Sequence, residues 1–218
     1  MTERLLQKYT SYLLIAFTLA VILLSAVVYR YPVLTIDVGI SQGLQEGFDA
    51  PLARAFAIYA ARAISFWGIP MVAVWLVLIV SFLFWRARYY LENLFCMLTL
   101  TAPAINTLIK YLINRPRPTT EFVSIFDYQL SPSFPSGHVV FYTTFFGYLI
   151  FTMAYTDRLP RWLRTTIIVI SVLMIATVSF SRLYLGVHWL TDVIAGYLLG
   201  FSILLILMYF YLRMKKSR

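Results

Sequence analysis

Long apolar stretches without a formal charge dominate the chain. Six of them, bounded by charged residues or histidine, are long enough to cross about 30 Å of hydrocarbon as α-helices. They are residues 9–29, 63–85, 93–109, 139–156, 165–181 and 193–212. Helices are expected because backbone groups that face lipid must be satisfied within their own segment, and the period-two alternation of a membrane barrel is absent. The pattern predicts an all-α fold: an integral membrane bundle of six transmembrane helices.

The composition agrees with this pattern. Hydrophobic residues make up 61% of the 218 residues, charged residues make up 12%, and the mean hydropathy is +0.80. That leaves too little polar surface to enclose a soluble globule of this size. Arg4 and Lys8 before the first stretch also suit a secretory signal, but the apolar run exceeds the usual ~7–15 residues and lacks an A-x-A site. We expect one six-helix domain over residues 1–218.

Lysine and arginine placement orients the bundle. With both termini cytoplasmic, eleven of the 18 basic residues fall on the inner side and seven on the outer side, in agreement with the positive-inside rule. The net charge of +9 is therefore explained by the orientation of the bundle in the membrane, and no nucleic-acid partner is expected. Tyr184 and Trp189 are expected at the outer interface, whereas Trp75, in the middle of its segment, is expected to pack between helices.

Three polar clusters interrupt the apolar pattern. They are Lys110 with Arg117-Pro118, the run Pro135-Ser136-Gly137-His138, and Ser181-Arg182 followed by His188 and Asp192. The chain has only two histidines, and each belongs to one of these clusters. Counting the crossings places all three clusters at the outer surface, so we expect them to form one site.

The third cluster has the spacing of an oriented imidazole. His188 and Asp192 are four residues apart and share a face on a helix, so the carboxylate can accept the proton of Nδ1. Nε2 is then unprotonated and able to attack, as in a triad whose imidazole is itself the nucleophile. A lone histidine at a membrane boundary is usually structural, but pairing with a carboxylate inside a basic cluster favours function.

The second cluster is typical of a helix start. Ser136 is expected to be the N-cap, Gly137 lets the backbone approach a ligand, and His138 in the first turn is placed to act as a general acid. Taken alone, the run could equally be an ordinary junction of a loop and a helix.

Cations accompany both histidines. Lys110, Arg117 and Arg182 are expected to neutralise the oxygens of a phosphoryl group. Arg30, Arg62 and Arg115 are expected only to snorkel toward the interface.

The three clusters resemble the tripartite signature of the type 2 phosphatidic acid phosphatase family: K-x6-R-P, P-S-G-H and S-R-x5-H-x3-D. The resemblance implies a phosphatase that needs no metal or cofactor and works through a phosphohistidine. It implies His188 as nucleophile, Asp192 as its orienting carboxylate and His138 as acid and then base. It also implies a set of phosphate-binding residues, which are Lys110, Arg117, Ser136, Gly137 and Arg182.

The sequence leaves open which lipid is the substrate and which of three functions the protein has. We expect a bacterial cytoplasmic membrane protein that acts at the outer leaflet on a lipid phosphate such as undecaprenyl pyrophosphate, phosphatidylglycerol phosphate or phosphatidic acid. A phosphotransferase using the same histidine and a non-hydrolytic lipid transporter are the alternatives, whereas the related vanadium haloperoxidases are soluble. Residues 30–62 hold Phe48, Leu52, Phe56 and Tyr59 at helical spacing, which suits either an interfacial helix or a helix packed over the other helix ends.

Overall fold

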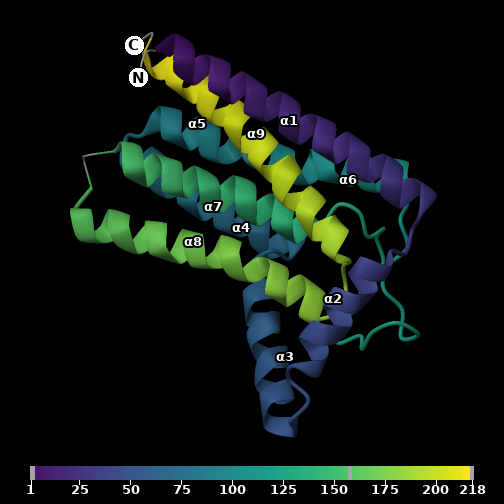
Figure 1. Cartoon of the computed structure of the whole chain (residues 1–218). Helices are drawn as coiled ribbons and strands as arrows, with labels where there is room; N and C mark the ends of the chain where they lie inside the picture. The colour runs from purple at the N-terminus through teal and green to yellow at the C-terminus, as the bar shows by residue number, and fades with distance from the viewer. Residues whose placement is uncertain (1–2, 157–158, 217–218) are drawn as a thin grey trace.

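Helices make up all of the regular structure in the computed structural model, which describes residues 3–156 and 159–216 (Figure 1). No strand occurs within those residues, so the predicted all-α class is confirmed. The helices are α1 Glu3–Arg30, α2 Thr35–Glu46, α3 Pro51–Phe66, α4 Pro70–Arg86, α5 Tyr90–Leu98, α6 Thr101–Ile113, α7 Gly137–Tyr155, α8 Arg161–Tyr184 and α9 Leu190–Lys216.

Five described helical stretches are long and apolar enough to cross a membrane: Thr10–Arg30, Tyr90–Ile113, Gly137–Tyr155, Arg161–Tyr184 and Leu190–Lys216. A sixth crossing results if α3 and α4 form one span, and these helices meet at 53°. The predicted span 63–85 is therefore interrupted near Gly68. Ile69 has an extended backbone, as expected for a residue that precedes proline, and Pro70 begins α4.

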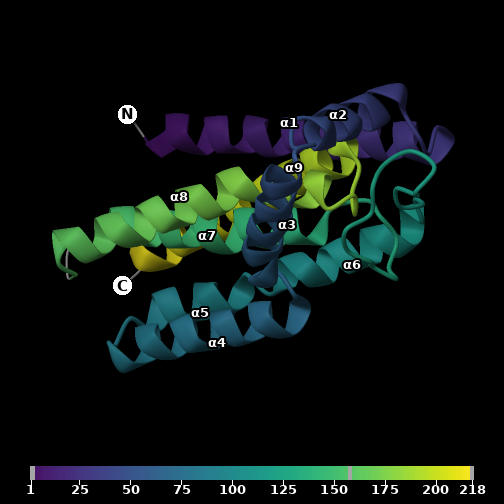
Figure 2. The same ribbon diagram turned by 90° about the horizontal axis from the view of Figure 1, so that it is seen from below.

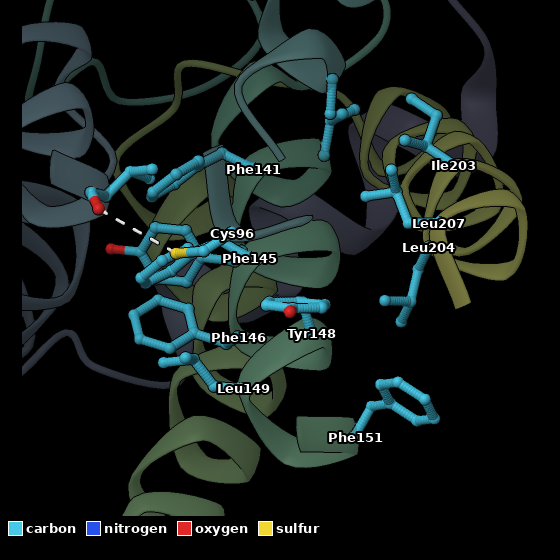
Figure 3. Close-up of a cluster of buried hydrophobic side chains, with 14 of the residues drawn as sticks. Cys96, Phe141, Phe145, Phe146, Tyr148, Leu149, Phe151, Ile203, Leu204 and Leu207 are labelled. Carbon is cyan, nitrogen blue, oxygen red and sulfur yellow. Dashed lines mark hydrogen bonds between the residues drawn. The ribbon is translucent and has the colours of Figure 1, made fainter. Parts of the chain in front are cut away.

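The central helix of the bundle is α7, which packs against α8 and α9 and also contacts α6 (Figures 1 and 2). Its side chains are apolar around most of the helix and nearly all of them are buried, as expected for a helix surrounded by others. Figure 3 shows Phe141, Phe145 and Tyr148 of α7 in the cluster that also contains Leu204 and Leu207 of α9.

Close packing of α7 on α9 brings two parts of the polar site together. A Cβ atom at Gly196 would lie 2.9 Å from Val139 Cβ, and one at Gly200 would lie 2.7 Å from Thr143 Cβ. Small residues four apart allow such close approach of helices in lipid, where packing rather than water exclusion holds helices together. The start of α7 and the start of α9 are consequently adjacent.

The exposure of three aromatic residues differs from what the sequence suggested. Trp75, expected to pack between helices, is 59% exposed and faces outward from α4. Tyr184 and Trp189, expected at the interface, are 1% and 0% exposed. Trp189 Nε1 donates to the Pro116 carbonyl at 3.1 Å, so its polar atom is satisfied inside the protein instead of at the lipid surface.

Residues 30–62 form two helices instead of one. The helix α2 packs against α8 and α9, and α3 packs against the end of α8 and projects from the bundle (Figure 1), so this segment covers the helix ends. Small residues of α3, Ala57 and Ala61, face the bundle, whereas Leu52 and Phe56 are 85% and 72% exposed. The large apolar side chains on this helix therefore point outward, away from the bundle.

The start of α1 and the end of α9 lie at the same end of the bundle, opposite the end where α2 and the long loop between α6 and α7 lie (Figure 1). This agrees with an even number of crossings. Asp157, Arg158 and Arg218, which contributed to the predicted inner charge, lie outside the described residues.

Candidate active site

The structure gathers the three polar clusters at one end of the bundle. Lys110 lies in the last turn of α6, His138 in the first turn of α7, Arg182 in the last turn of α8 and Asp192 in the first turn of α9. Short contacts connect them: Ser136 N donates to the Asp192 carbonyl at 3.0 Å. The side chains are inside the protein, since Lys110 is 7% exposed and Arg182 and Asp192 are fully buried.

His188 is held between an acceptor and a cation. Its Nδ1 lies 3.4 Å from Asp192 Oδ2, and its Nε2 lies 3.4 Å from Arg117 Nη1. A carboxylate only accepts and a guanidinium only donates, so both neighbours favour a proton on Nδ1 and a lone pair on Nε2. This tautomer leaves the unprotonated nitrogen of His188 facing the guanidinium group of Arg117.

Asp192 has more partners than the sequence suggested. Its Oδ2 accepts from the Trp189 backbone N–H at 2.9 Å and from the Ser133 hydroxyl, and the same hydroxyl lies 3.4 Å from His188 Nδ1. Ser133 was not predicted, because it precedes the Pro135–His138 run and no spacing rule singles it out. It is fully buried beside the imidazole.

Two cations hold the loop that covers the site. Lys110 Nζ donates to the Pro132 carbonyl at 2.5 Å and to the Ser133 carbonyl at 3.1 Å. Arg117 donates to the Ser131 carbonyl at 2.7 Å and to the Val187 carbonyl at 2.5 Å. The chain can place Arg117 here because α6 ends where Asn114 adopts a left-handed conformation, and the prolines that follow prevent helix.

Unpartnered donors mark a place for an anion. Within the described part of the chain, Nε and Nη2 of the buried Arg182 have no hydrogen-bond partner, and neither has the buried hydroxyl of Ser136. Ser136 is the N-cap residue of α7, yet its side chain makes no capping bond. Buried polar groups are almost always satisfied, so these atoms together indicate a ligand with several acceptor oxygens.

His138 contacts the break between α3 and α4. Its Nε2 lies 3.1 Å from the Ser65 carbonyl, which can only accept, so Nε2 carries a proton. Arg182 Nη1 donates to the Ser65 hydroxyl. A Cβ atom at Gly68 would lie 2.3 Å from His138 Cδ2, so only glycine fits against this imidazole.

The prediction for Arg115 was wrong. This arginine is fully buried instead of snorkelling, and it forms ion pairs with Asp192 at 2.6 Å and with Asp37 at 2.7 Å. Asp37 lies in α2 and is also fully buried. Sequence reasoning placed it in the outer stretch without a role, since its partner is distant in the sequence. The other two arginines expected to snorkel differ: Arg62 donates to the Phe126 carbonyl at 2.8 Å, and Arg30 is exposed over the Tyr31 ring.

Burial and nearby cations keep the His188 imidazole neutral. Burial lowers the pKa of His188 well below its ordinary value of 6.5, and the charges of Arg117, Lys110 and Arg182 lower it further. Burial also lowers the pKa of Arg117 to about 10, so this guanidinium stays protonated at neutral pH. A neutral imidazole has a free lone pair at pH 7.

A cavity of about 310 Å³ opens beside Arg117. It is lined by residues of the loop and of the turn after α8, including Thr119, Asp127, Gln129 and Val187. Arg117, whose Nη1 lies 3.4 Å from His188 Nε2, therefore borders this open cavity. Among the described residues, no group of three or more His, Cys, Asp or Glu side chains is arranged to hold a metal ion.

A family model described as the PAP2 superfamily matches residues 92–216, more than half of the chain. An undecaprenyl-diphosphatase of Sulfolobus acidocaldarius is 38% identical over 104 residues, which cover 45% of this chain and 45% of the relative. Phosphatidylglycerophosphatase B of Bacillus subtilis is 31% identical over 118 residues, which cover 52% and 55%. The chain thus spans about half the length of these curated relatives.

Two solved structures share the fold. A transmembrane PAP2 type phosphatidylglycerolphosphate phosphatase from Bacillus subtilis superposes with a TM-score of 0.80 at 23% identity, covering 95% of this chain and all of that one. LpxE of Aquifex aeolicus gives 0.61 at 21% identity, covering 82% and 98%. With its apolar helices and this fold, the chain is an integral membrane protein.

Proposed function

The chain belongs to the PAP2 superfamily, and from this premise we propose that it is a lipid phosphatase. It removes the terminal phosphate of a lipid phosphate or pyrophosphate at the outer leaflet. The observation that carries the proposal is the setting of His188, whose Nδ1 faces Asp192 and whose Nε2 faces Arg117. An imidazole oriented by a carboxylate and aimed at phosphate-binding cations suits nucleophilic attack on phosphorus.

The first step transfers the phosphoryl group to the enzyme. His188 Nε2 attacks phosphorus and the bond from phosphorus to the leaving oxygen breaks. His138, in its doubly protonated form, gives that oxygen a proton and becomes neutral. Arg117, Lys110 and Arg182 stabilise the charge that spreads over the other three oxygens. The unpartnered nitrogens of Arg182 and the free hydroxyl of Ser136 support this role, because phosphate oxygens would satisfy them.

The second step releases phosphate. Water gives a proton to His138, its oxygen attacks phosphorus, and the bond from phosphorus to His188 Nε2 breaks. No metal takes part in this proposal. Asp192, the one carboxylate within the motifs, is already engaged by Arg115, Ser133 and the Trp189 backbone, which supports a role in orientation instead of metal ligation.

We place the site at the outer leaflet, with both termini cytoplasmic, because lysine and arginine are biased toward the opposite end of the bundle. The substrates named for the relatives are the first to test. Purified protein in detergent should release phosphate from undecaprenyl pyrophosphate, phosphatidylglycerol phosphate or phosphatidic acid, and excess chelator should leave the rate unchanged. A preference for a short soluble phosphate ester over all three lipids would contradict the proposal.

Variants test the roles separately. His188→Ala should abolish release, and Asp192→Asn should reduce it about 10⁴-fold by analogy with loss of the orienting carboxylate in a triad. Asp49→Asn, at an exposed ion pair, is the matched control and should retain wild-type turnover. Full turnover by His188→Ala would refute the assignment.

The covalent intermediate can be trapped. With p-nitrophenyl phosphate, whose leaving group needs no acid, His138→Asn should be phosphorylated but should hydrolyse slowly, so an acid-labile phosphohistidine should accumulate. Mass spectrometry should locate the phosphate on His188. Addition of a lipid alcohol distinguishes a phosphotransferase, since phosphate would then appear on the acceptor instead of in water.

A further inference from the structure

Three charged side chains form a buried network behind the proposed nucleophile. Arg115, Asp37 and Asp192 all have fully buried side chains. Arg115 Nη1 donates to Asp192 Oδ1 at 2.6 Å, and Nη2 donates to Asp37 Oδ2 at 2.7 Å. Thr191 joins them, since its backbone N–H donates to Asp37 Oδ1 at 2.9 Å. The network therefore connects α2, the loop after α6 and the start of α9.

The two oxygens of Asp192 have different tasks in this arrangement. Oδ1 is bound by Arg115, whereas Oδ2 faces His188 and accepts from Ser133 and from the Trp189 backbone. With Oδ1 fixed, the carboxylate cannot rotate, and Oδ2 stays directed at the Nδ1 side of the imidazole. The His188 to Asp192 distance of 3.4 Å leaves this contact dependent on the angle of the carboxylate.

Asp37 balances the charge of Arg115. Without Asp37, the positive charge of Arg115 would be compensated by the Asp192 carboxylate alone. Asp192 would then attract the Nδ1 proton of His188 less strongly. With both carboxylates, the network carries a net negative charge beside the imidazole, which becomes positive as Nε2 bonds to phosphorus. Asp37 lies outside residues 92–216, the region that the family model matches.

We infer that Asp37 and Arg115 are positioning residues for the proposed phosphatase reaction, which hold Asp192 so that it orients His188. Neither residue touches the place proposed for phosphate, and both act through Asp192. The inference rests on the proposed function for its kinetic consequence, but its effect on the imidazole can be measured without any substrate.

Removing the negative charge of Asp37 and removing the positive charge of Arg115 should shift the pKa of His188 in opposite directions. The groups that face this imidazole are Arg117 and Ser133 from the loop, Lys110 from α6, His138 from α7, Arg182 from α8 and Asp192 from α9. Asp37→Asn removes a negative charge from the network and should lower the pKa of His188. Arg115→Gln removes a positive charge and should raise it, and the double variant should bring it back toward the wild-type value.

Kinetics give the first readout. Asp37→Asn and the Asp37→Asn/Arg115→Gln double variant should lower kcat by about 10-fold to 100-fold while KM changes by less than about threefold, since a misplaced carboxylate affects the attack and not phosphate binding. The exposed pair Asp49 and Arg54 offers a matched control, and the same substitutions there should leave both constants unchanged. Unchanged kcat in a folded Asp37→Asn protein would overturn the inference.

The second readout uses the fact that the chain has only two histidines. In an untagged His138→Asn protein labelled with [¹⁵N]histidine, the remaining imidazole signal belongs to His188. The expected signal is the Nδ1–H tautomer at neutral pH, with loss of that preference in the double variant. The expected order of pKa is Arg115→Gln highest, then the parent protein, then Asp37→Asn. Identical tautomers and pKa values in all folded variants would overturn the inference.

The two readouts separate the possible failures. Should Arg115→Gln not fold, Asp37→Asn and the double variant still decide between positioning and a merely structural role. A wild-type protein that hydrolyses none of the lipids would count against the proposed function alone, because the tautomer and the order of pKa would still be measured. Activity with unaltered kcat in the variants would count against the positioning role alone.

Discussion

Arg115 and Arg182 are both completely buried in the same site, yet they differ in how well they are satisfied. All three nitrogens of the Arg115 guanidinium group donate hydrogen bonds, to Asp37, to Asp192 and Thr191, and to the Pro32 carbonyl at 2.8 Å. Within residues 3–156 and 159–216, only one nitrogen of Arg182 has a partner, the Ser65 hydroxyl.

The difference separates two uses of a buried charge. A buried cation with two carboxylates is compensated inside the protein, so removing it leaves buried charges without a partner. A buried cation with free donors is compensated only when a ligand supplies acceptors. The same residue type is thus part of the scaffold in one place and, we propose, part of the phosphate site in the other.

The largest expected effect is on stability. Arg115→Gln should lower the free energy of unfolding by about 3–5 kcal/mol, because Asp37 and Asp192 would face each other without the guanidinium between them. Unfolding in detergent micelles, followed by circular dichroism, measures the change. Arg54→Gln, which removes an exposed ion pair, should cost less than about 1 kcal/mol. Equal stability of the two variants would remove the distinction between a buried network and a surface pair.

The next effect is on catalysis. Arg182→Gln should lower kcat/KM by about 10²–10³-fold, the usual consequence of losing one donor to a developing anion. Its stability should stay at the wild-type level or rise, because an uncompensated buried charge disappears. Steady-state hydrolysis of the preferred lipid and unfolding in the same micelles measure both quantities. A variant that is destabilised like Arg115→Gln but keeps its kcat/KM would reverse the comparison.

A smaller effect concerns Ser65, whose hydroxyl accepts from Arg182. Ser65 lies in the last turn of α3, just before the break at Gly68, and a methyl group at Gly68 would lie 2.3 Å from His138 Cδ2 and 2.9 Å from Tyr142 Cε2. Gly68→Ala should therefore displace Ser65 or His138, at a cost of about 1–3 kcal/mol in stability and with a lower kcat. Thermal unfolding and turnover measure the two effects.

A matched glycine makes this test specific. Gly43 lies inside α2, and among the described residues nothing beyond the adjoining backbone of its own helix lies within 4 Å of the place of a Cβ. Gly43→Ala should therefore be neutral or stabilising by a few tenths of a kcal/mol to about 1 kcal/mol. A Gly68→Ala protein with the stability and turnover of Gly43→Ala would show that the break does not press on His138.

The apolar pattern was sufficient to predict the long apolar helical stretches, but not the bend in one of them. A helix that crosses the bilayer needs an uncharged run of a minimum length, so such runs can be found in the sequence. The described spans accordingly fall close to the predicted ones. The break at Gly68 depends on Pro70 and on the contact of glycine with His138, 70 residues later. The glycine and proline were visible in the sequence, whereas the contact was not.

The candidate site was also predicted only in part from the sequence. The three clusters contain most of the polar groups around His138 and His188, and counting the membrane crossings predicted that the clusters would meet. The roles assigned to these residues stay predictions. Asp37 and Ser133 were missed because a single buried polar residue leaves no periodic signal. Arg115 was misread because burial decides whether a cation snorkels or pairs, and its partner Asp37 is 78 residues away in the sequence.

The smallest effect at neutral pH is on His188, which faces Asp192, the ion-pair partner of Arg115, and whose pKa is lowered by burial and by the charge of Arg182. Because its pKa is lowered by burial and by Arg117, Lys110 and Arg182, the folded protein binds a proton at this imidazole only well below pH 6.5. The unfolded chain binds it first, so this group should make stability fall as the pH drops below 6.5. In kcat/KM it should produce an acid limb below pH 6.5, with about a tenfold loss per pH unit once the imidazole is protonated.

The phosphate of the substrate also titrates, at a pKa of about 6, so its own titration should be measured by ³¹P resonance and divided out. Arg182→Gln removes one of the charges that lower the pKa of His188, so its limb should move toward neutral pH. The exposed control Arg54→Gln should leave the limb in place. Two outcomes would contradict this prediction: an acid limb of the wild-type protein above pH 6.5, or a limb that moves to lower pH in Arg182→Gln. Either would mean that the charge of Arg182 does not lower the pKa of His188. The contrast between Arg115 and Arg182 would then concern stability alone.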